Sequence, residues 1–296
     1  MKYRTKNIAI IIPTNGNKSI LSVLKSIKSQ TNKPGQIIVI QNQKKKINLS
    51  LRLTLIHSKK KNQVYQRSLA KKYFKKHIKI ILQLDDYVCL KKNALKALVK
   101  EWNNSEKYTA GIGLYVINYN LKKNLLLKLL DYESKYPGKV LRSGYVTGWG
   151  KNFFTTYPNW LNGGTTSWNL KYAKDLFTRK YPLLKWSVCE DVIYSYNKTK
   201  KYKLKLSTKS KAFYLPRNSK ISFSEYFYRG LILSKVIKNF VIYNKNLSLL
   251  HFYKQTVVMS ISGLFFNIIL FNFSYTGYFI ARIYGCFKKT YNFKIK

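Results

Sequence analysis

The stretch IKIILQLDDYVCL, residues 78–90, delivers an apolar run into two adjacent carboxylates, Asp85 and Asp86. Its first seven residues are typical of a strand that is buried on both faces. Only 10 of the 296 residues are acidic, yet four of these ten form two adjacent pairs, Asp85-Asp86 and Glu190-Asp191. A random scatter would give roughly 0.3 adjacent pairs. We therefore expect the strand to end at an active site, and the second pair is the next candidate.

The composition indicates a folded protein with an unusual charge. A content of 46% hydrophobic residues in 296 positions can build one large domain, or one domain with an appendage. The net charge of +46 favours nucleic acid or an anionic membrane as partner, although lysines spread along the whole chain also fit a drifted composition. No zinc-finger spacing or RNP-like motif accompanies the lysines. We therefore expect no nucleic-acid partner.

Three widely spaced cysteines, Cys89, Cys189 and Cys286, form neither a CxxC pair nor a Cys/His cluster of the zinc type. They indicate reduced thiols in a cytosolic compartment. The apolar run at residues 8–12 is interrupted by Pro13 and is too short for a signal peptide. We therefore expect that the chain is not exported by that route.

Strand-like and helix-like segments alternate through the first 117 residues. The predicted strands are 8–12, 37–40, 53–56, 78–84 and 112–117, and the predicted helices are 20–27, 63–74 and 94–102. This alternation predicts an α/β fold with a mostly parallel sheet that is covered by helices on both faces. Ligands collect at the carboxyl ends of such strands, where Pro13 to Asn15, Gln41-Asn42 and Asp85-Asp86 lie.

The region from Ser143 to Leu170 interleaves glycines with aromatic residues. This pattern indicates irregular backbone around a binding face, with tryptophans available to stack on a ligand. The alternative is that these aromatic residues are simply core. The residues concerned include Gly144, Gly148, Gly150, Gly163, Gly164, Trp149, Trp160 and Trp168.

Residues 226–296 change character again. Residues 226–243 have a basic amphipathic pattern, and residues 255–281 run for 27 positions without a charge, which is long enough to span a bilayer. Because Lys254 precedes this run and Lys288 follows it, a helical hairpin that returns to the same face fits the flanking charges better than a span. We expect association with the cytoplasmic face of a membrane, peripheral or monotopic or with one spanning helix. The alternative is a buried helix pair in a soluble protein.

The acid pairs suggest a division of labour. Adjacent side chains on a strand point in opposite directions, so one of Asp85 and Asp86 can take a metal ion while the other binds a sugar or base. Magnesium is typically held by one or two carboxylates and by substrate phosphates. An acid on a separate segment, Glu190 or Asp191, is then free to act as general base. The alternative for each pair is helix capping or salt bridging to the surplus lysines.

Six stretches resemble a family 2 glycosyltransferase of the GT-A fold, in consistent order over residues 7–225. They are IAIIIPTNGN, SILSVLKSIKSQTNKPGQIIVIQN, VYQRSLA with Arg67, LQLDDYV, WLNGGTTSWN and CEDVIYSYNKTKKYKL. The resemblance implies a Rossmann-like GT-A catalytic domain at 1–225, followed by helices at 226–296 that we expect to be membrane-associated. It also implies transfer of a sugar, with inversion, from a nucleotide-diphosphate sugar to a hydroxyl of a glycan or lipid-linked glycan during synthesis of a surface polysaccharide.

The resemblance also implies residue roles. It puts Asp85 and Asp86 at the ribose, diphosphate and metal, with Asp86 as the ligand of Mg²⁺ or Mn²⁺. Asp191 would be the base, with Glu190 beside it. The remaining nucleotide-sugar site would comprise Pro13, Thr14, Asn15, Asn42, Arg67, Gly163 and Gly164, and the acceptor would contact Trp149, Trp160 and Trp168.

Three positions depart from the family pattern. Tyr87 stands where the family has a third acid, Gln41-Asn42 stands where it often has an acidic residue, and Tyr214 stands where many members have a histidine. These departures favour an alternative function, a GT-A domain that has lost catalysis and binds a nucleotide-sugar or glycan.

Overall fold

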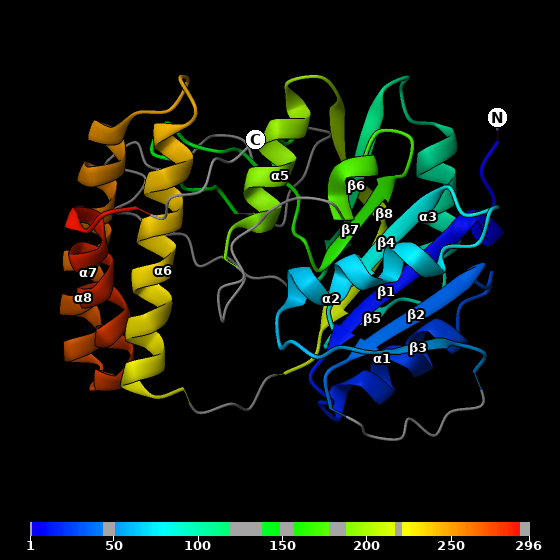
Figure 1. The fold of residues 1–296 in the computed structure, drawn as a ribbon, viewed down its shortest axis with the longest axis horizontal. Coiled ribbons are helices and arrows are strands. Elements are labelled where there is room, and N and C mark those ends of the chain that lie inside the picture. The colour runs from blue at the N-terminus through cyan, green and yellow to red at the C-terminus, as the bar shows by residue number, and fades with distance from the viewer. Residues whose placement is uncertain are drawn as a thin grey trace. The chain divides into compact units, whose positions relative to one another are not determined.

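The structure is a computed structural model that describes residues 2–43, 51–118, 138–148, 157–177, 188–216 and 221–290. The chain forms two compact units (Figure 1). Unit 1 comprises Met1–Leu121 and Trp149–Arg217, and unit 2 comprises Lys122–Gly148 and Asn218–Lys296. The C-terminal helices thus form a unit of their own, which also includes the described residues 138–148.

Unit 1 is built on an eight-stranded sheet in the order β3-β2-β1-β4-β7-β6-β8-β5. The strands are β1 (Ile8–Thr14), β2 (Gln36–Gln41), β3 (Thr54–His57), β4 (Ile80–Leu84), β5 (Val88–Leu90), β6 (Thr109–Val116), β7 (Thr165–Asn169) and β8 (Lys203–Tyr214). Strands β3, β2, β1 and β4 run parallel to one another, as predicted. Beyond β4 the sheet is mixed, because β7 is antiparallel to β4 and β6, and β5 is antiparallel to β8.

Helices cover both faces of this sheet, as the alternating pattern predicted. One face packs Ile10 and Ile12 against α1 (Ser19–Lys28) and α3 (Ala94–Asn103). The other face packs Ile11 and Ile81 against the segment formed by α2 (Gln63–Leu69) and η2 (Ala70–Tyr73). The remaining short elements of unit 1 are η1 (Thr5–Asn7), η3 (Lys174–Phe177) and α5 (Glu190–Thr199). A sheet buried on both faces explains why strands β1, β2 and β4 are almost wholly apolar.

Strand β7 lies in the region that the sequence predicted to be irregular. All five of its residues, TTSWN, are buried, and the hydroxyl groups of Thr166 and Ser167 have internal partners. The Ser167 hydroxyl donates to the carbonyl of Ile112 at 2.8 Å and accepts from the Trp102 indole at 3.1 Å. Because buried polar groups are tolerated once they are hydrogen-bonded, a strand can form here without an apolar run.

The strand register brings the predicted polar residues to one edge of the sheet. In the parallel pairs, Thr14 lies opposite Gln41, and Ile11 lies opposite Gln83. The residues that follow β1, β2 and β4 therefore meet at the carboxyl edge, which is the ordinary ligand edge of an open α/β sheet.

Unit 2 contains three long helices, α6 (Phe223–Ile242), α7 (Leu249–Ile269) and α8 (Phe273–Phe287). The uncharged run at 255–281 is therefore divided between two helices. The N–H of Phe271 donates to Ile268 and the N–H of Asn272 donates to Asn267, which is the Schellman pattern of a helix end. Phe271 takes a φ of 52°, where a residue with a Cβ is strained by roughly 1–2 kcal/mol.

Glycines set the spacing of the helices in unit 2. A Cβ on Gly230 would collide with the backbone carbonyl of Tyr278, and a Cβ on Gly277 would press on the ring and carbonyl of Phe223. Helices α6 and α8 therefore pack closely. Among the described residues, no helix combines the length and the hydropathy that crossing a bilayer requires.

Candidate active site

The two acids after β4 face different groups, as the strand pleat requires. Asp86 is 7% exposed, and its Oδ2 accepts hydrogen bonds from Thr14 Oγ1 at 2.7 Å and from Asn17 Nδ2 at 3.1 Å. These contacts tie the end of β4 to the turn after β1. Asp86 thus serves to position this turn, and Asp85 is the acid that faces the charged side chains of the site.

Asp85 is surrounded by donors. Its Oδ1 accepts from Arg67 Nη2 at 2.9 Å and from the Gln63 amide, and its Oδ2 accepts from the Tyr87 hydroxyl at 2.9 Å. Gln63 and Arg67 both come from α2, whose first turn lies beside the end of β4. The Tyr87 hydroxyl therefore contacts the carboxylate of Asp85, two residues earlier. At the position where the family has a third acid, this chain has a hydrogen-bond donor to Asp85.

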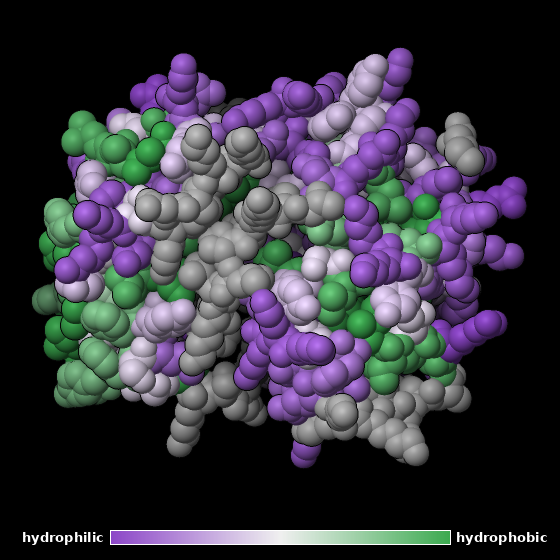
Figure 2. Space-filling view, viewed as in Figure 1, coloured by the Kyte–Doolittle hydropathy of each residue, from purple (hydrophilic) through white to green (hydrophobic). Residues whose placement is uncertain are grey.

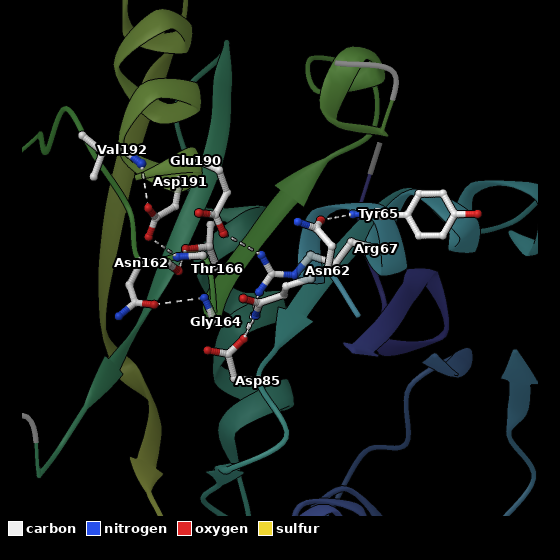
Figure 3. Close-up of polar contacts among 12 residues, drawn as sticks. Asn62, Tyr65, Arg67, Asp85, Asn162, Gly164, Thr166, Glu190, Asp191 and Val192 are labelled. Carbon is white, nitrogen blue, oxygen red and sulfur yellow. Dashed lines mark hydrogen bonds and ion pairs between the residues drawn. The ribbon is translucent and has the colours of Figure 1, made fainter. Parts of the chain in front are cut away.

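Arg67 joins the two acid pairs. Figure 3 shows its guanidinium between the carboxylates of Asp85 and Glu190, and the Nη1 to Glu190 Oε1 distance is 3.5 Å. The Arg67 side chain is only 6% exposed, and those of Asp85 and Glu190 are 14% and 15% exposed. The second pair therefore belongs to the same site as the first, although more than a hundred residues separate them in the chain.

The second pair lies at the start of α5. The Asp191 carboxylate accepts from the backbone N–H of Gly163 and from that of Val192, each at 2.9 Å. Glu190 and Asp191 occupy the first turn of the helix, where the macrodipole favours negative charge. Cys189, which precedes them, takes a φ of 59° and turns the chain into the helix.

The glycine pair lies directly against these acids. A Cβ on Gly164 would collide with the Asp85 carboxylate, and a Cβ on Gly163 would lie 3.0 Å from Asp191 Cβ. The Gly164 carbonyl also accepts from the N–H of Asp85 at 3.1 Å. Glycine is thus required here for close approach between the end of β4, the start of β7 and the start of α5.

Burial and like charge raise the proton affinity of the second pair. Burial and the neighbouring Asp191 carboxylate raise the pKa of Glu190 to about 7, although Arg67 opposes the rise. Burial also raises the pKa of Asp191, against the hydrogen bonds from Gly163 and Val192. A pKa of about 7, as at Glu190, lies in the range in which a carboxylate works as a general base near neutral pH.

The raised pKa of Glu190 predicts a pH-dependent stability. Because this pKa moves from an ordinary 4.5 to about 7, ionising Glu190 in the folded protein costs free energy. We expect the stability that protonated Glu190 contributes to be fully present below pH 4.5 and to be lost as the pH rises to about 7. Urea unfolding across this range should show wild type losing stability relative to Glu190→Gln. Glu225→Gln, on α6, is the control and should keep the wild-type profile.

Buried polar atoms without partners mark the ends of β1 and β2. Within the described ranges, the amide oxygens of Asn15, Gln41 and Asn42 and the Nε of Arg67 are buried and have no hydrogen-bond partner. Such atoms call for a ligand or water, because an unpaired buried polar group costs about 1–3 kcal/mol. Asn15 and Asn42 were predicted to bind the nucleotide, and Pro13 lies on β1 next to them. Gln66, whose amide donates to the carbonyls of Thr14 and Ile40, fixes this edge from α2.

The charge balance of the site accommodates a cation. Among the described residues, no group of three or more His, Cys, Asp or Glu side chains has the arrangement of a metal site. However, Asp85 and Glu190 share the guanidinium of Arg67, and Asp191 lies beside Glu190, so a diphosphate would add to an excess of negative charge. One carboxylate together with substrate phosphates is enough for Mg²⁺. Asp85, which faces Arg67, is a candidate for this role beside the predicted Asp86, whose Oδ2 accepts two hydrogen bonds.

Two of the three predicted acceptor-binding tryptophans, Trp160 and Trp168, are buried. Trp168 is 2% exposed and packs edge-on against Tyr194, with ring centroids 4.8 Å apart, and Trp160 is 6% exposed. The alternative interpretation, that they are core, fits both residues, because β7 carries Trp168 into the interior. Trp149 lies outside the described residues.

Sequence reasoning missed the polar chain around Tyr214. The Asn162 amide donates to the Tyr214 hydroxyl at 2.8 Å and accepts from the N–H of Gly164 at 2.9 Å. The rings of Tyr87 and Tyr214, two of the residues that depart from the family pattern, lie 5.4 Å apart. The two rings are adjacent because β5 pairs with β8. Neither strand was predicted from an apolar run in the sequence.

Comparison with solved structures defines the fold class. The GalNAc-T7 structure with UDP, GalNAc and Mn²⁺ matches with a TM-score of 0.59 and 13% identity, over 84% of this chain and 50% of that chain. S. aureus TarS 1-349 in complex with UDP-GlcNAc matches with a TM-score of 0.50 and 16% identity, over 86% of this chain and 70% of that chain. These likenesses show a GT-A-like fold. This chain spans half of the length of the GalNAc-T7 chain. No protein-family model and no curated protein sequence matches the chain.

Proposed function

We propose that this protein is an inverting glycosyltransferase that moves a sugar from a nucleotide-diphosphate sugar to an acceptor hydroxyl. The observation that carries the proposal is the cluster of Asp85, Arg67, Glu190 and Asp191 at the carboxyl edge of a GT-A-like sheet. The neighbouring structures contain UDP or UDP-GlcNAc, which supports a nucleotide-sugar as donor. The resemblance in the motifs further favours family 2.

In the proposed reaction, the Asp191 carboxylate removes the proton from the acceptor hydroxyl, whose oxygen then attacks the anomeric carbon. The bond from that carbon to the diphosphate oxygen breaks, and the nucleoside diphosphate leaves with the bonding electrons. The guanidinium of Arg67 stabilises the negative charge that develops on the leaving diphosphate. Glu190 forms an ion pair with Arg67, and the two backbone N–H groups that donate to Asp191 fix the direction of its carboxylate.

A divalent cation fits this reaction. When bound with the donor, Mg²⁺ or Mn²⁺ would neutralise charge on the diphosphate, and Asp85 is the carboxylate placed to hold it. The presence of Mn²⁺ in the GalNAc-T7 structure supports this choice of ion.

The acceptor and the location complete the proposal. We propose a glycan or lipid-linked glycan as acceptor and the cytoplasmic face of a membrane as location. All three cysteines are free of disulfides, which supports a reducing compartment.

Thermal shift with a panel of nucleoside diphosphates tests the donor site. A ligand that binds only the folded state raises the melting temperature, by an amount that follows its affinity and concentration. We expect one nucleoside diphosphate to raise the melting temperature in the presence of Mn²⁺ and the shift to shrink in EDTA. Asp85→Asn should reduce the shift more than Asp86→Asn. If no nucleotide raised the melting temperature, the proposed function would be wrong.

The second candidate is a binding module without catalysis. The contact of Tyr87 with Asp85 favours it, because this hydroxyl occupies an oxygen that a cation would otherwise share. Such a module would raise its melting temperature with a nucleotide-sugar but would not consume it.

A further inference from the structure

Helices α7 and α8 are packed with their polar side chains inward. The buried polar side chains of the two helices are Gln255, Thr256, Ser260, Asn267, Thr276 and Arg282. The Thr256 hydroxyl contacts the Tyr145 hydroxyl at 2.8 Å, and the Arg282 guanidinium lies over the Tyr145 ring at 4.9 Å. Helix α6 buries apolar side chains, Val236, Ile237 and Phe240, together with the polar Ser234 and Asn239.

The outer faces of α7 and α8 are strongly apolar. The exposed large hydrophobic residues include Leu250, Ile261, Phe265, Phe266, Ile268, Ile269, Leu270, Phe271, Phe273, Ile280, Tyr284 and Phe287. They are densest at residues 265–273, which we call the α7–α8 corner. Figure 2 shows hydrophobic surface over these helices, at the left of the view. A monomer in water seldom exposes a patch of this size.

Phe271 is the most exposed residue of the α7–α8 corner. It is 81% exposed, and its backbone is held in the left-handed region that glycine normally occupies at a helix end. Neither folding nor solubility accounts for a large apolar side chain in a strained position. An observed outlier of this kind points to a function of the side chain itself.

The pattern of charge identifies the partner. Residues 221–290 contain eight basic residues and one acidic residue, and residues 255–281 contain none. Exposed Lys254 lies eleven residues before Phe265 on α7, about 16 Å along the helix. This length is close to the roughly 15 Å of hydrocarbon in one leaflet, so Lys254 would reach the headgroups of the same leaflet. Polar groups between helices and apolar groups outside are also the arrangement found in lipid.

We propose that the α7–α8 corner inserts into an anionic lipid leaflet and anchors the protein to one membrane face. Lys254 and Lys288, at the other ends of the two helices, then contact acidic headgroups. This anchor does not depend on the proposed reaction, because all of its residues belong to unit 2.

Co-sedimentation of the full chain with phosphatidylcholine vesicles containing phosphatidylglycerol tests the anchor. Phe271→Gly relieves the backbone strain, so it should raise the melting temperature by about 2 °C or more. The same change should weaken vesicle binding by about tenfold or more, because a buried phenyl group is lost. These opposite effects separate loss of binding from loss of folding. Tyr108→Gly, at φ 68° and 51% exposed in unit 1, is the matched control and should leave vesicle binding unchanged.

Three results would overturn the proposal. The first is wild-type protein that stays in the supernatant with these vesicles. The second is unchanged vesicle binding by Phe271→Gly. The third is that the protein forms a dimer without lipid and that Phe271→Gly converts this dimer to a monomer while vesicle binding stays unchanged. This result would assign the apolar face to a second copy of the chain.

Discussion

Asp191→Asn is expected to lower the rate of sugar transfer by roughly 10²–10⁴-fold, which is the usual contribution of a general base. The amide cannot accept the acceptor proton. Its oxygen can still accept from Gly163 or Val192, and loss of a negative charge beside Glu190 offsets the other hydrogen bond. The melting temperature and the affinity for the nucleoside diphosphate should therefore change little. Steady-state kinetics with the donor identified by thermal shift measure the effect.

Asp175→Asn provides the matched control for this variant. Asp175 is 52% exposed and forms an ion pair with Lys198 at 2.6 Å, away from Arg67. Its replacement should leave turnover unchanged. Turnover by Asp191→Asn at the wild-type rate would exclude Asp191 as the base, and Glu190→Gln would then be the variant expected to lose activity.

Arg67→Met is expected to lower the free energy of unfolding by about 3–5 kcal/mol, because it leaves two nearly buried carboxylates without their shared cation. Asp85 and Glu190 are only 14% and 15% exposed, so water does not replace the guanidinium. Urea denaturation at neutral pH measures the loss. Donor affinity should fall as well, since Arg67 is the cation of the cluster.

Two further variants define the origin of this loss. Arg229→Met breaks an ion pair with Glu225 whose side chains are 30% and 34% exposed, and it should cost at most about 1 kcal/mol. Adding Glu190→Gln to Arg67→Met should recover part of the lost stability, because one unpaired carboxylate is removed. A loss below about 1 kcal/mol in Arg67→Met would show that the ion pairs of the cluster do not stabilise the fold.

The parts of the fold that the sequence predicted correctly are those in which burial leaves a continuous apolar run. Strands β1, β2 and β4 belong to this class. Because these strands were predicted correctly, so was the proximity of Thr14 and Asp86 at one edge of the sheet. Strand β7 was missed because its buried Thr and Ser residues are satisfied by hydrogen bonds that only the folded sheet supplies. Alternation along β4 predicted that Asp85 and Asp86 face opposite ways but could not tell which one faces the site.

Tertiary pairing explains the remaining differences. The contact of Tyr87 with Tyr214 depends on the register of β5 with β8, which neither segment determines alone. The division of residues 255–281 depends on the left-handed backbone of Phe271, a residue that is not typical of a helix end. The inward packing of the polar side chains in this run could be seen only in the structure.

The most direct test of glycosyl transfer is the release of nucleoside diphosphate from a panel of nucleotide-diphosphate sugars. The assay compares wild type with Asp191→Asn, in the presence of Mn²⁺ and membrane extract as a source of acceptor. We expect wild type to release nucleoside diphosphate from the donor that it binds and Asp191→Asn to release almost none. Binding of a donor by wild type without any release would contradict the proposed transferase and would favour a nucleotide-sugar binding module.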